Sequence, residues 1–381
     1  MKKKVGALIA SLIASTMLVT ACGSDEDSDS AIQESTVTVD ESSNTEESTP
    51  VAEQTTTIVL GDSIKIDGGG AEASSAGIRI TESGTYTISG ALENGMIEVD
   101  AAGEAVELVL NGVAISNVDG PAILFTGTSS AIVTLAEGTM NRLSDGGDGE
   151  YDGALYSTGT LTVQGSGRLD VEGNAEEGIA SEMHLNIDGG TIHITSKDDG
   201  LNANNDNVSI ITINDGYLYI EAGGDGIDSN GALTINGGTV IALSSLTDAN
   251  GGLDADGEVL INGGTVIATG ERLSVPETST EQKTIIVDFR SPKQANSLVS
   301  IMCEGNELLT FAPALTYRSL LFSSAELSDG RTYDIYNGGS TLGNQTDGVY
   351  EIGTYTAGML TDSVTTQSIN SYSKSNRMPP R

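Results

Sequence analysis

The sequence predicts an all-β protein, a right-handed parallel β-helix of about eight or nine coils with a small C-terminal β cap. Three observations predict this fold: a repeat, period-two alternation of apolar residues, and glycine at the corners. One sequence pattern recurs five times: an alternating strand is followed by a polar residue and a glycine-rich turn. Its central residues are separated by 24, 26, 22 and 26 positions, and they are Val163, Ile187, Ile213, Ile235 and Ile261.

Each repeat contains two further short strands. The second alternates as in Leu169 and Val171, and the third follows a glycine-containing corner, as in Ile227 and Ser229. Three such strands describe one coil of a parallel β-helix, because glycine supplies the positive φ of a sharp corner. No body segment has the period of an amphipathic helix, which disfavours βαβ folds. The right hand is expected from the usual hand of parallel crossovers.

Five segments are predicted along the chain. A cap is included because the repeat ends near residue 281 while strand-like runs continue, and a solenoid needs its open end covered. The segments are a lipoprotein signal peptide (1–21), a lipidated cysteine with a disordered acidic stalk (22–57), the parallel β-helix (58–281), the C-terminal β cap (282–356) and a flexible tail (357–381).

The N-terminus has the features of an export signal. Three lysines precede an apolar stretch from Val5 to Val19, which at about 15 residues is short for a membrane span. The stretch ends in Val19-Thr20-Ala21-Cys22, which resembles the lipobox of bacterial lipoproteins, whose cysteine is acylated and becomes the mature N-terminus. The alternative is an ordinary signal peptide with a chance cysteine. We expect an extracytoplasmic protein that is lipid-anchored to the bacterial membrane or cell surface.

The chain is strongly acidic. Its formal net charge is −37, and residues 23–57 hold ten acids and no Lys or Arg. Such a segment buries too little apolar surface to fold, so it is predicted to be a stalk, or merely a long solvated terminus. The charge excludes nucleic acid as a partner and favours cations. With Cys22 lipidated, Cys303 has no partner, so no disulfide framework is expected.

In a β-helix, equivalent positions of successive coils stack about 4.8 Å apart, which turns sequence columns into physical ones. One column is rich in amides, and we expect stacked side-chain hydrogen bonds along it. Its members are Gln164, Asp188, Asn214, Asn236 and Asn262.

Three other columns gather carboxylates and amides along one edge. The first of them contains the corner residues Glu177, Asp199 and Asp225. Unit charges at about 5 Å repel by roughly 3 kcal/mol at an effective dielectric near 20. Lys197 is the only Lys or Arg between residues 169 and 271. We therefore expect Ca²⁺, which prefers oxygen ligands; the alternative is a solvated acidic edge with monovalent counterions. The predicted metal ligands are Asp198, Asp199, Asn202, Asn204, Asp225, Asp228, Asn230, Asp254 and Asp256.

The repeated Asn-Gly-Gly-Thr-Val and the Asp-Gly corners, behind a lipobox and an acidic stalk, resemble the carbohydrate-binding domain-containing proteins of clostridial-type cell surfaces. The resemblance covers roughly residues 58–356. It implies a calcium-binding right-handed parallel β-helix, similar in fold to pectate lyases, that binds polysaccharides including cellulose and acidic sugars. It also implies calcium at corners such as Asp225, Asp228, Asn202 and Asp254, and it identifies no sugar subsite.

Three functions are compatible with the sequence. The first is non-catalytic polysaccharide binding, with calcium shared between corner carboxylates and sugar hydroxyls or uronates. Tyr217 and Tyr219 are predicted to point outward and stack a sugar ring, with Lys197 nearby, although they could simply pack on their strand. The second is a polysaccharide lyase or hydrolase, using a base such as Lys197 or the more distant Arg168, or paired Asp side chains. The third is a structural adhesin.

Overall fold

The structure is a computed structural model that describes residue 51, residues 53–147 and residues 149–373. The predicted signal peptide, Cys22 and nearly all of the stalk lie outside these residues. The described chain is made of β-strands and turns and contains no helix. Accordingly, this part of the chain has no helix of the length and apolar character needed to cross a membrane.

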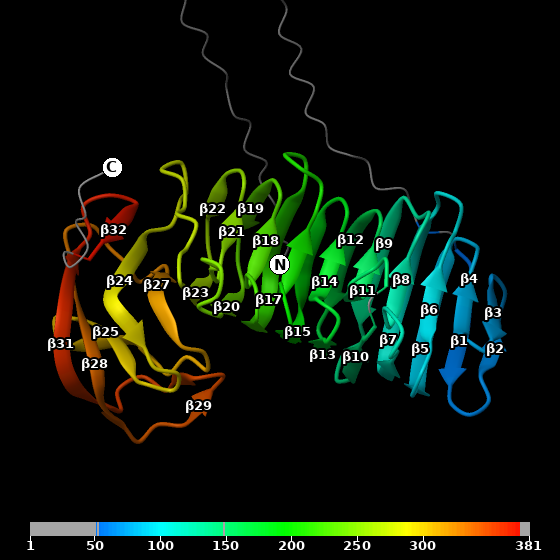
Figure 1. Ribbon diagram of the computed structural model, residues 1–381, viewed down its shortest axis with the longest axis horizontal. Coiled ribbons are helices and arrows are strands. Elements are labelled where there is room, and N and C mark those ends of the chain that lie inside the picture. The colour runs from blue at the N-terminus through cyan, green and yellow to red at the C-terminus, as the bar shows by residue number, and fades with distance from the viewer. Residues whose placement is uncertain (1–50, 52, 148, 374–381) are drawn as a thin grey trace, which may run out of the picture. The chain divides into compact units, whose positions relative to one another are not determined.

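The predicted solenoid is confirmed. A nine-stranded sheet forms one face, and its parallel strands mark about eight coils (Figure 1). Those strands are β4 (Gly77–Ile80), β6 (Met96–Val99), β8 (Ile123–Phe125), β11 (Gly153–Ser157), β14 (Glu177–Ser181), β16 (Leu201–Ala203), β18 (Ile227–Ser229) and β21 (Asp254–Ala255).

The other faces belong to a 17-stranded sheet in which long strands bend through a turn. For example, β12 (Thr160–Gly165) and β13 (Arg168–Gly173) both pair in parallel with β15 (Leu185–Ser196). The remaining solenoid strands of this sheet are β5 (Gly84–Leu92), β7 (Ala105–Ser116), β9 (Ser130–Leu135), β10 (Met140–Ser144), β17 (Ile210–Ala222), β19 (Ala232–Ile235), β20 (Thr239–Ser244), β22 (Val259–Ile261) and β23 (Thr265–Gly270).

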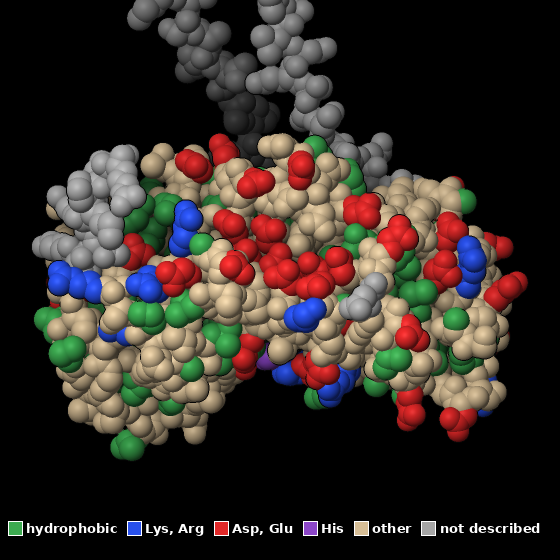
Figure 2. Space-filling model, viewed as in Figure 1, with side chains coloured by type: hydrophobic (Ala, Val, Ile, Leu, Met, Phe, Trp, Pro, Cys, Tyr) green, Lys and Arg blue, Asp and Glu red, His purple; other side chains and the backbone are tan. Residues whose placement is uncertain are grey.

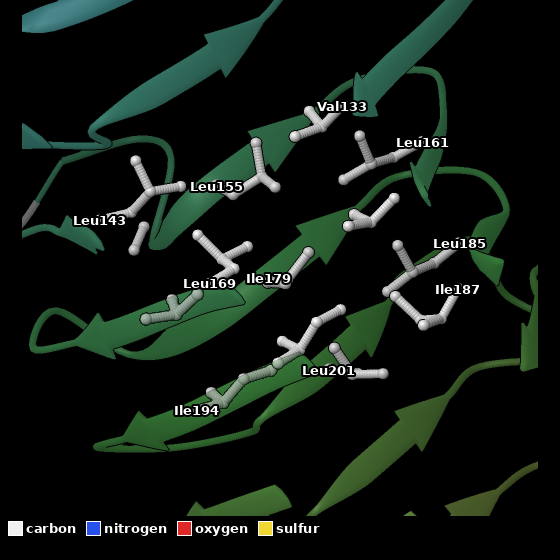
Figure 3. Packing of buried hydrophobic residues seen from close by; sticks show 14 of the residues in the cluster. Val133, Leu143, Leu155, Leu161, Leu169, Ile179, Leu185, Ile187, Ile194 and Leu201 are labelled. Atoms are coloured by element: carbon white, nitrogen blue, oxygen red, sulfur yellow. The ribbon is translucent and has the colours of Figure 1, made fainter. Parts of the chain in front are cut away.

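Aliphatic side chains from successive coils fill the interior (Figure 3). One column follows the strand register from Leu161 through Leu185, Ile211 and Leu233 to Val259, and none of the five is more than 2% exposed. Burying each such side chain contributes about 2 kcal/mol. The period-two alternation therefore marks the core as predicted.

Four of the five residues of the predicted amide column form a hydrogen-bonded ladder, whereas Gln164 Nε2 donates to Thr134 Oγ1 (3.0 Å) instead. Asn214 Nδ2 donates to Asp188 Oδ1 (2.7 Å), Asn236 Nδ2 to Asn214 Oδ1 (2.8 Å) and Asn262 Nδ2 to Asn236 Oδ1 (3.0 Å). The turn after the ladder needs glycine: Gly238 has φ 75°, and a Cβ there would lie 2.6 Å from the carbonyl oxygen of Gly216.

The N-terminal end of the solenoid is closed by antiparallel strands. β1 (Thr55–Leu60) pairs in parallel with β5 and antiparallel with β2 (Lys65–Asp67), and β3 (Ala71–Ser74) pairs antiparallel with β4. Ile64, Ile66 and Ala71 pack against the core. The first strand of the described chain begins at Thr55, so the last residues assigned to the stalk are part of a strand.

The predicted C-terminal cap closes the other end. β27 (Tyr317–Ser323) lies antiparallel to both β23 and β24 (Thr284–Lys293), and Ile286 and Leu321 join the solenoid core. A six-stranded sheet completes the cap. It consists of β25 (Val299–Cys303), β26 (Asn306–Phe311), β28 (Thr332–Thr341), β29 (Gln345–Thr346), β30 (Val349–Tyr350) and β31 (Tyr355–Thr365).

The cap also covers one side of the last coils, which the sequence did not predict. Tyr219, Ile241 and Ile267 point outward from their coils, yet they are buried in one cluster with cap residues such as Val299 and Phe322. Outward positions in these coils are apolar because the cap, rather than water, lies against them.

The prediction of a flexible tail from residue 357 is wrong for the residues that the structure describes. β31 runs to Thr365 and pairs with β28, and β32 (Asn370–Tyr372) pairs in parallel with β24. Main-chain pairing to neighbouring strands and the burial of Val364 in the cap cluster order this mostly polar segment. Residues 374–381 lie outside the described chain.

Candidate functional site

Acidic side chains gather near the middle of the face formed by the nine-stranded sheet (Figure 2). The strand register stacks Asn202, Asp228 and Asp254 as predicted. Main-chain hydrogen bonds likewise stack the corners, since Gly178 N donates to Asp199 O and Gly200 N to Asp225 O. We call this surface the acidic face; its residues are Glu177, Asp198, Asp199, Asn202, Asp225, Asp228 and Asp254.

The carboxylates of the acidic face are held by the next coil. Asp225 N donates to Asp199 Oδ1 (2.7 Å), and Gly251 N donates to Asp225 Oδ1 (2.5 Å). Asn202 Nδ2 donates to Asp199 Oδ2 (3.0 Å). Two oxygens keep no partner: Asn202 Oδ1 and Glu177 Oε2 are buried without a hydrogen bond, and their residues are 5% and 7% exposed. Unpartnered buried oxygens of this kind are costly unless a ligand satisfies them.

Burial and mutual repulsion make these groups weak acids. Burial raises the pKa of Asp199 to about 8 and that of Asp228 to about 7, and neighbouring carboxylates add to both shifts. Burial also raises the pKa of Asp225 to about 6. The pKa of Glu177 is raised by burial and then by Asp152 and Asp199. The acidic face is therefore electrostatically strained whenever its carboxylates are ionised.

A cleft of about 330 Å³ lies at one end of the acidic face, lined by Asp225, Asp254 and Arg272 among others. Ser274 Oγ donates to Asp254 Oδ1 (2.7 Å). Sequence reasoning did not find Arg272 or Ser274, because they follow the last repeat and belong to no column. The cleft thus combines acceptors, a hydroxyl and one guanidinium.

The predicted column that contains Asn204, Asn230 and Asp256 has different contacts from the acidic face. Asn204 and Asp256 are exposed, and Asn230 Nδ2 donates to Asn204 O (3.2 Å) and Asp206 Oδ1 (3.0 Å). These three residues stack along the main chain as expected, but their side chains are not buried with the others.

The donor chemistry of the acidic face fits a hard cation, since its ligands are carboxylate and amide oxygens. The orphaned oxygens of Asn202 and Glu177 support that fit. However, within the described residues no three His, Cys, Asp or Glu side chains are grouped closely enough to hold a metal ion. Amide and main-chain oxygens would have to complete any coordination.

The structure separates the residues predicted to bind sugar. Lys197 lies beside the acidic face, where its Nζ donates to Ala175 O (2.8 Å) and lies 3.1 Å from Glu176 Oε1. Tyr217 and Tyr219 lie on a different face, beside the cap.

Tyr219 cannot stack a sugar as predicted, because the cap buries it (9% exposed) and its hydroxyl donates to Glu221 Oε1 (2.6 Å). Tyr217 is half-buried. Arg168 is on the same face as Tyr217 and pairs with Asp170 (2.6 Å), so it cannot serve as a base at the acidic face.

Comparison with known proteins identifies the family. The family model described as carbohydrate-binding domain-containing protein matches residues 74–309. The chain belongs to this family.

A carbohydrate-binding domain-containing protein of Acetivibrio thermocellus is 33% identical over 134 residues, which is 33% of this chain and 47% of the relative. The match thus spans about half the length of that relative. A solved structure described as the polysaccharide lyase-like protein from C. thermocellum, gadolinium derivative, is 29% identical. It covers 56% of this chain and 93% of its own, with a TM-score of 0.47.

For this carbohydrate-binding domain-containing protein we predict that stability without divalent cations falls as the pH rises from about 4 to about 8. Folded Asp199 and Asp228 have raised pKa values, so the folded state binds more protons than the unfolded state across this range. Their stabilising contribution is complete below about pH 4 and is lost as the pH passes the folded values. Melting temperatures measured in chelator across this range should fall by roughly 5 °C or more.

Replacing both residues, Asp199→Asn with Asp228→Asn, should flatten that dependence, whereas Asp215→Asn at an exposed acid should leave it unchanged. A melting temperature that is independent of pH in the parent chain contradicts the prediction.

Proposed function

We propose that the protein binds polysaccharide, without catalysis, through calcium held on the acidic face, and that a lipid on Cys22 anchors it outside the cytoplasm. The observation that carries the proposal is a stack of carboxylates, from buried Asp199 through half-buried Asp225 and Asp228 to exposed Asp254, beside an open polar cleft. Buried oxygens of Glu177 and Asn202 in the same stack have no hydrogen-bond partner, and the chain belongs to the carbohydrate-binding family. A related protein's name alone would not indicate where on the solenoid binding takes place.

Calcium is supported by charge and by ligand type. Asp199, Asp225 and Asp228 each have their pKa raised by burial and further by neighbouring acids, and a divalent cation would relieve the repulsion among them. We assign Asp199, Asn202, Asp225, Asp228 and Asp254 as its ligands. Asp198, Asn204, Asn230 and Asp256 lie outside the column of Asn202, Asp228 and Asp254, and the Asn230 amide already bonds Asn204 O and Asp206, so these four would bind at most peripherally.

The sugar would bind at the cleft beside these ligands. When bound, calcium offers open coordination positions for sugar hydroxyls or uronate oxygens, which lets a strongly negative protein bind an anionic polymer. Arg272 supplies an additional hydrogen-bond donor at the same cleft, whereas the Ser274 hydroxyl already donates to Asp254. Lys197 lies near enough to the acidic face to contribute a charge there, although it already contacts Glu176.

We propose the absence of catalysis because of where the cationic side chains lie and what they already contact. A lyase requires a base near the reacting uronate, and Lys197 already contacts Ala175 O and Glu176, while Arg168 lies on another face. Arg272 is the one cationic residue among the described residues that line the cleft. One observation favours an enzyme instead: carboxyl groups with pKa values near neutrality can serve as general acid and base. A polysaccharide lyase or hydrolase is therefore the second candidate, ahead of a structural adhesin.

Calcium binding predicts a thermal shift. Chelator should lower the melting temperature of the parent chain, because calcium at 100 times its Kd stabilises the folded state by about 2.7 kcal/mol. The paired change Asp228→Asn with Asp254→Asn should abolish most of this shift, and Asp215→Asn should preserve it. An unchanged melting curve in excess chelator would instead support a solvated edge with monovalent counterions.

Glycan binding is tested on an array probed with calcium and with chelator. We expect calcium-dependent binding to acidic polysaccharides such as polygalacturonate, lost in the variant that carries both Asp228→Asn and Asp254→Asn. Absorbance and reducing-end assays on the same polymer should detect no product. Product formation would establish the enzyme, and the absence of any glycan signal would favour the adhesin.

Lipid anchoring is tested by fractionation of cells. The change Cys22→Ala should abolish metabolic labelling with fatty acid and move the protein from the membrane to the soluble fraction, since lipid chains provide the anchor. The matched change Cys303→Ala, at the half-buried free cysteine of β25, should leave the protein in the membrane. Retention of the Cys22→Ala protein in the membrane would contradict the lipoprotein assignment.

A further inference from the structure

A second surface with the features of a binding site lies where the cap meets the side of the solenoid. Two adjoining hollows, of about 420 Å³ and about 290 Å³, share Tyr217 and Thr346 in their linings. The two hollows adjoin at these shared residues, and we call them together the junction groove. It lies on a different face from the acidic face and contains none of the proposed calcium ligands.

The floor of the junction groove is a single column of outward residues. The strand register connects them in the order Arg168, Thr191, Tyr217, Thr239 and Thr265. With a spacing of about 4.8 Å per coil, the column is about 19 Å long. That spacing is close to the length of one sugar residue in an extended, β-linked pyranose chain. A glycan lying along the solenoid axis would therefore present one residue to each coil.

The wall of the groove comes from the cap. Leu308, Val349, Tyr350 and the exposed Ile352 (56%) face a floor that carries threonine hydroxyls. Apolar surface beside hydroxyl groups matches the chemistry of a pyranose, which has apolar C–H faces and hydroxyl edges. The lining is therefore suited to a sugar better than to a purely apolar or purely charged ligand.

The cap turn that forms part of this wall is fixed in place. Asp347 Oδ2 accepts a hydrogen bond from Tyr217 Oη (2.7 Å) and lies 2.8 Å from His193 Nε2. The rings of His193 and Tyr217 stack with centroids 5.8 Å apart. The central aromatic residue of the floor is thus held in one orientation before any ligand arrives, which lowers the entropic cost of binding.

The charges of the groove favour a neutral ligand. Its one guanidinium, on Arg168, is paired with Asp170, and its lining includes the carboxylates of Asp347 and Glu326. An anionic chain would meet no unpaired cation among these described residues. We infer that the junction groove binds an extended, neutral, β-linked oligosaccharide lengthwise, with Tyr217 at its centre and without calcium. This inference rests on the proposed carbohydrate-binding function and adds a second site to it.

The test is calorimetric titration of the purified full-length chain with a neutral β-1,4-linked glucose hexasaccharide, in chelator and below the melting temperature. The parent chain should bind. Tyr217→Ala should weaken binding by about tenfold or more, equivalent to about 1.4 kcal/mol. Tyr217→Phe keeps the ring and should retain most of the affinity.

A second pair of variants keeps the test valid if Tyr217→Ala loosens the cap. Thr239→Phe fills the groove floor and should abolish binding, while Thr234→Phe places the same side chain at a half-buried threonine outside the groove, on β19 of the same coil, and should not. Unchanged affinity in both Tyr217→Ala and Thr239→Phe overturns the inference, as does a complete requirement for calcium.

Titration with a galacturonate hexasaccharide in calcium separates the two sites. If this acidic sugar binds and the neutral one does not, the inference about the junction groove is wrong and the proposed function stands. If neither binds under any condition, the proposed function fails together with this inference.

Discussion

The hydrogen-bonded stacking of each coil on the next, at about 4.8 Å, is the constraint on which the rest of the structure depends. It repeats every side-chain position along the axis, so each column is either favourable or unfavourable as a whole. Leu185 and Ile211 gain by stacking because they exclude water together, and Asn214 and Asn236 gain because each amide donates to the next. The same spacing brings the carboxylates of the acidic face together, where ionised groups repel.

The chain offsets this repulsion only in part. Main-chain N–H groups of the following coil bind Asp199 and Asp225, which fixes their carboxylates and favours ionisation, but burial outweighs that effect and the pKa values remain raised. The repulsion that remains is concentrated at one corner of the coils, beside a cleft. Elsewhere an acid can pair with arginine, as Asp100 does with Arg79. Side-chain arrangements that destabilise a fold locally are expected at the sites where a protein binds ligands.

The sequence could predict whatever the repeat encodes. Register, amide ladder and acidic columns followed from aligning residues such as Ile187, Ile213 and Ile235, because stacking converts alignment directly into contact. The sequence could not predict contacts that arise from packing outside the repeat. The burial of Tyr219 requires the cap to fold back onto the side of the coils, and the only signal was that the outward positions of later coils become apolar, as at Ile241. Order in β31 and β32 comes from main-chain pairing and from an isolated buried residue, Val364, and a mostly polar sequence reveals neither.

The cap therefore has a role beyond ending the solenoid. On a bare β-helix, outward residues form nearly flat strips that offer little enclosure to a ligand. Where β29 and β30 overhang β17 and β20, a strip containing Tyr217 and Thr239 becomes the floor of a groove. On the other side of the same coil, Asp225 and Asp228 belong to the acidic face, which the cap leaves uncovered. One coil thus contributes to two surfaces of opposite character. A cation is required only where carboxylates stack, so binding at the two surfaces is expected to respond independently to calcium.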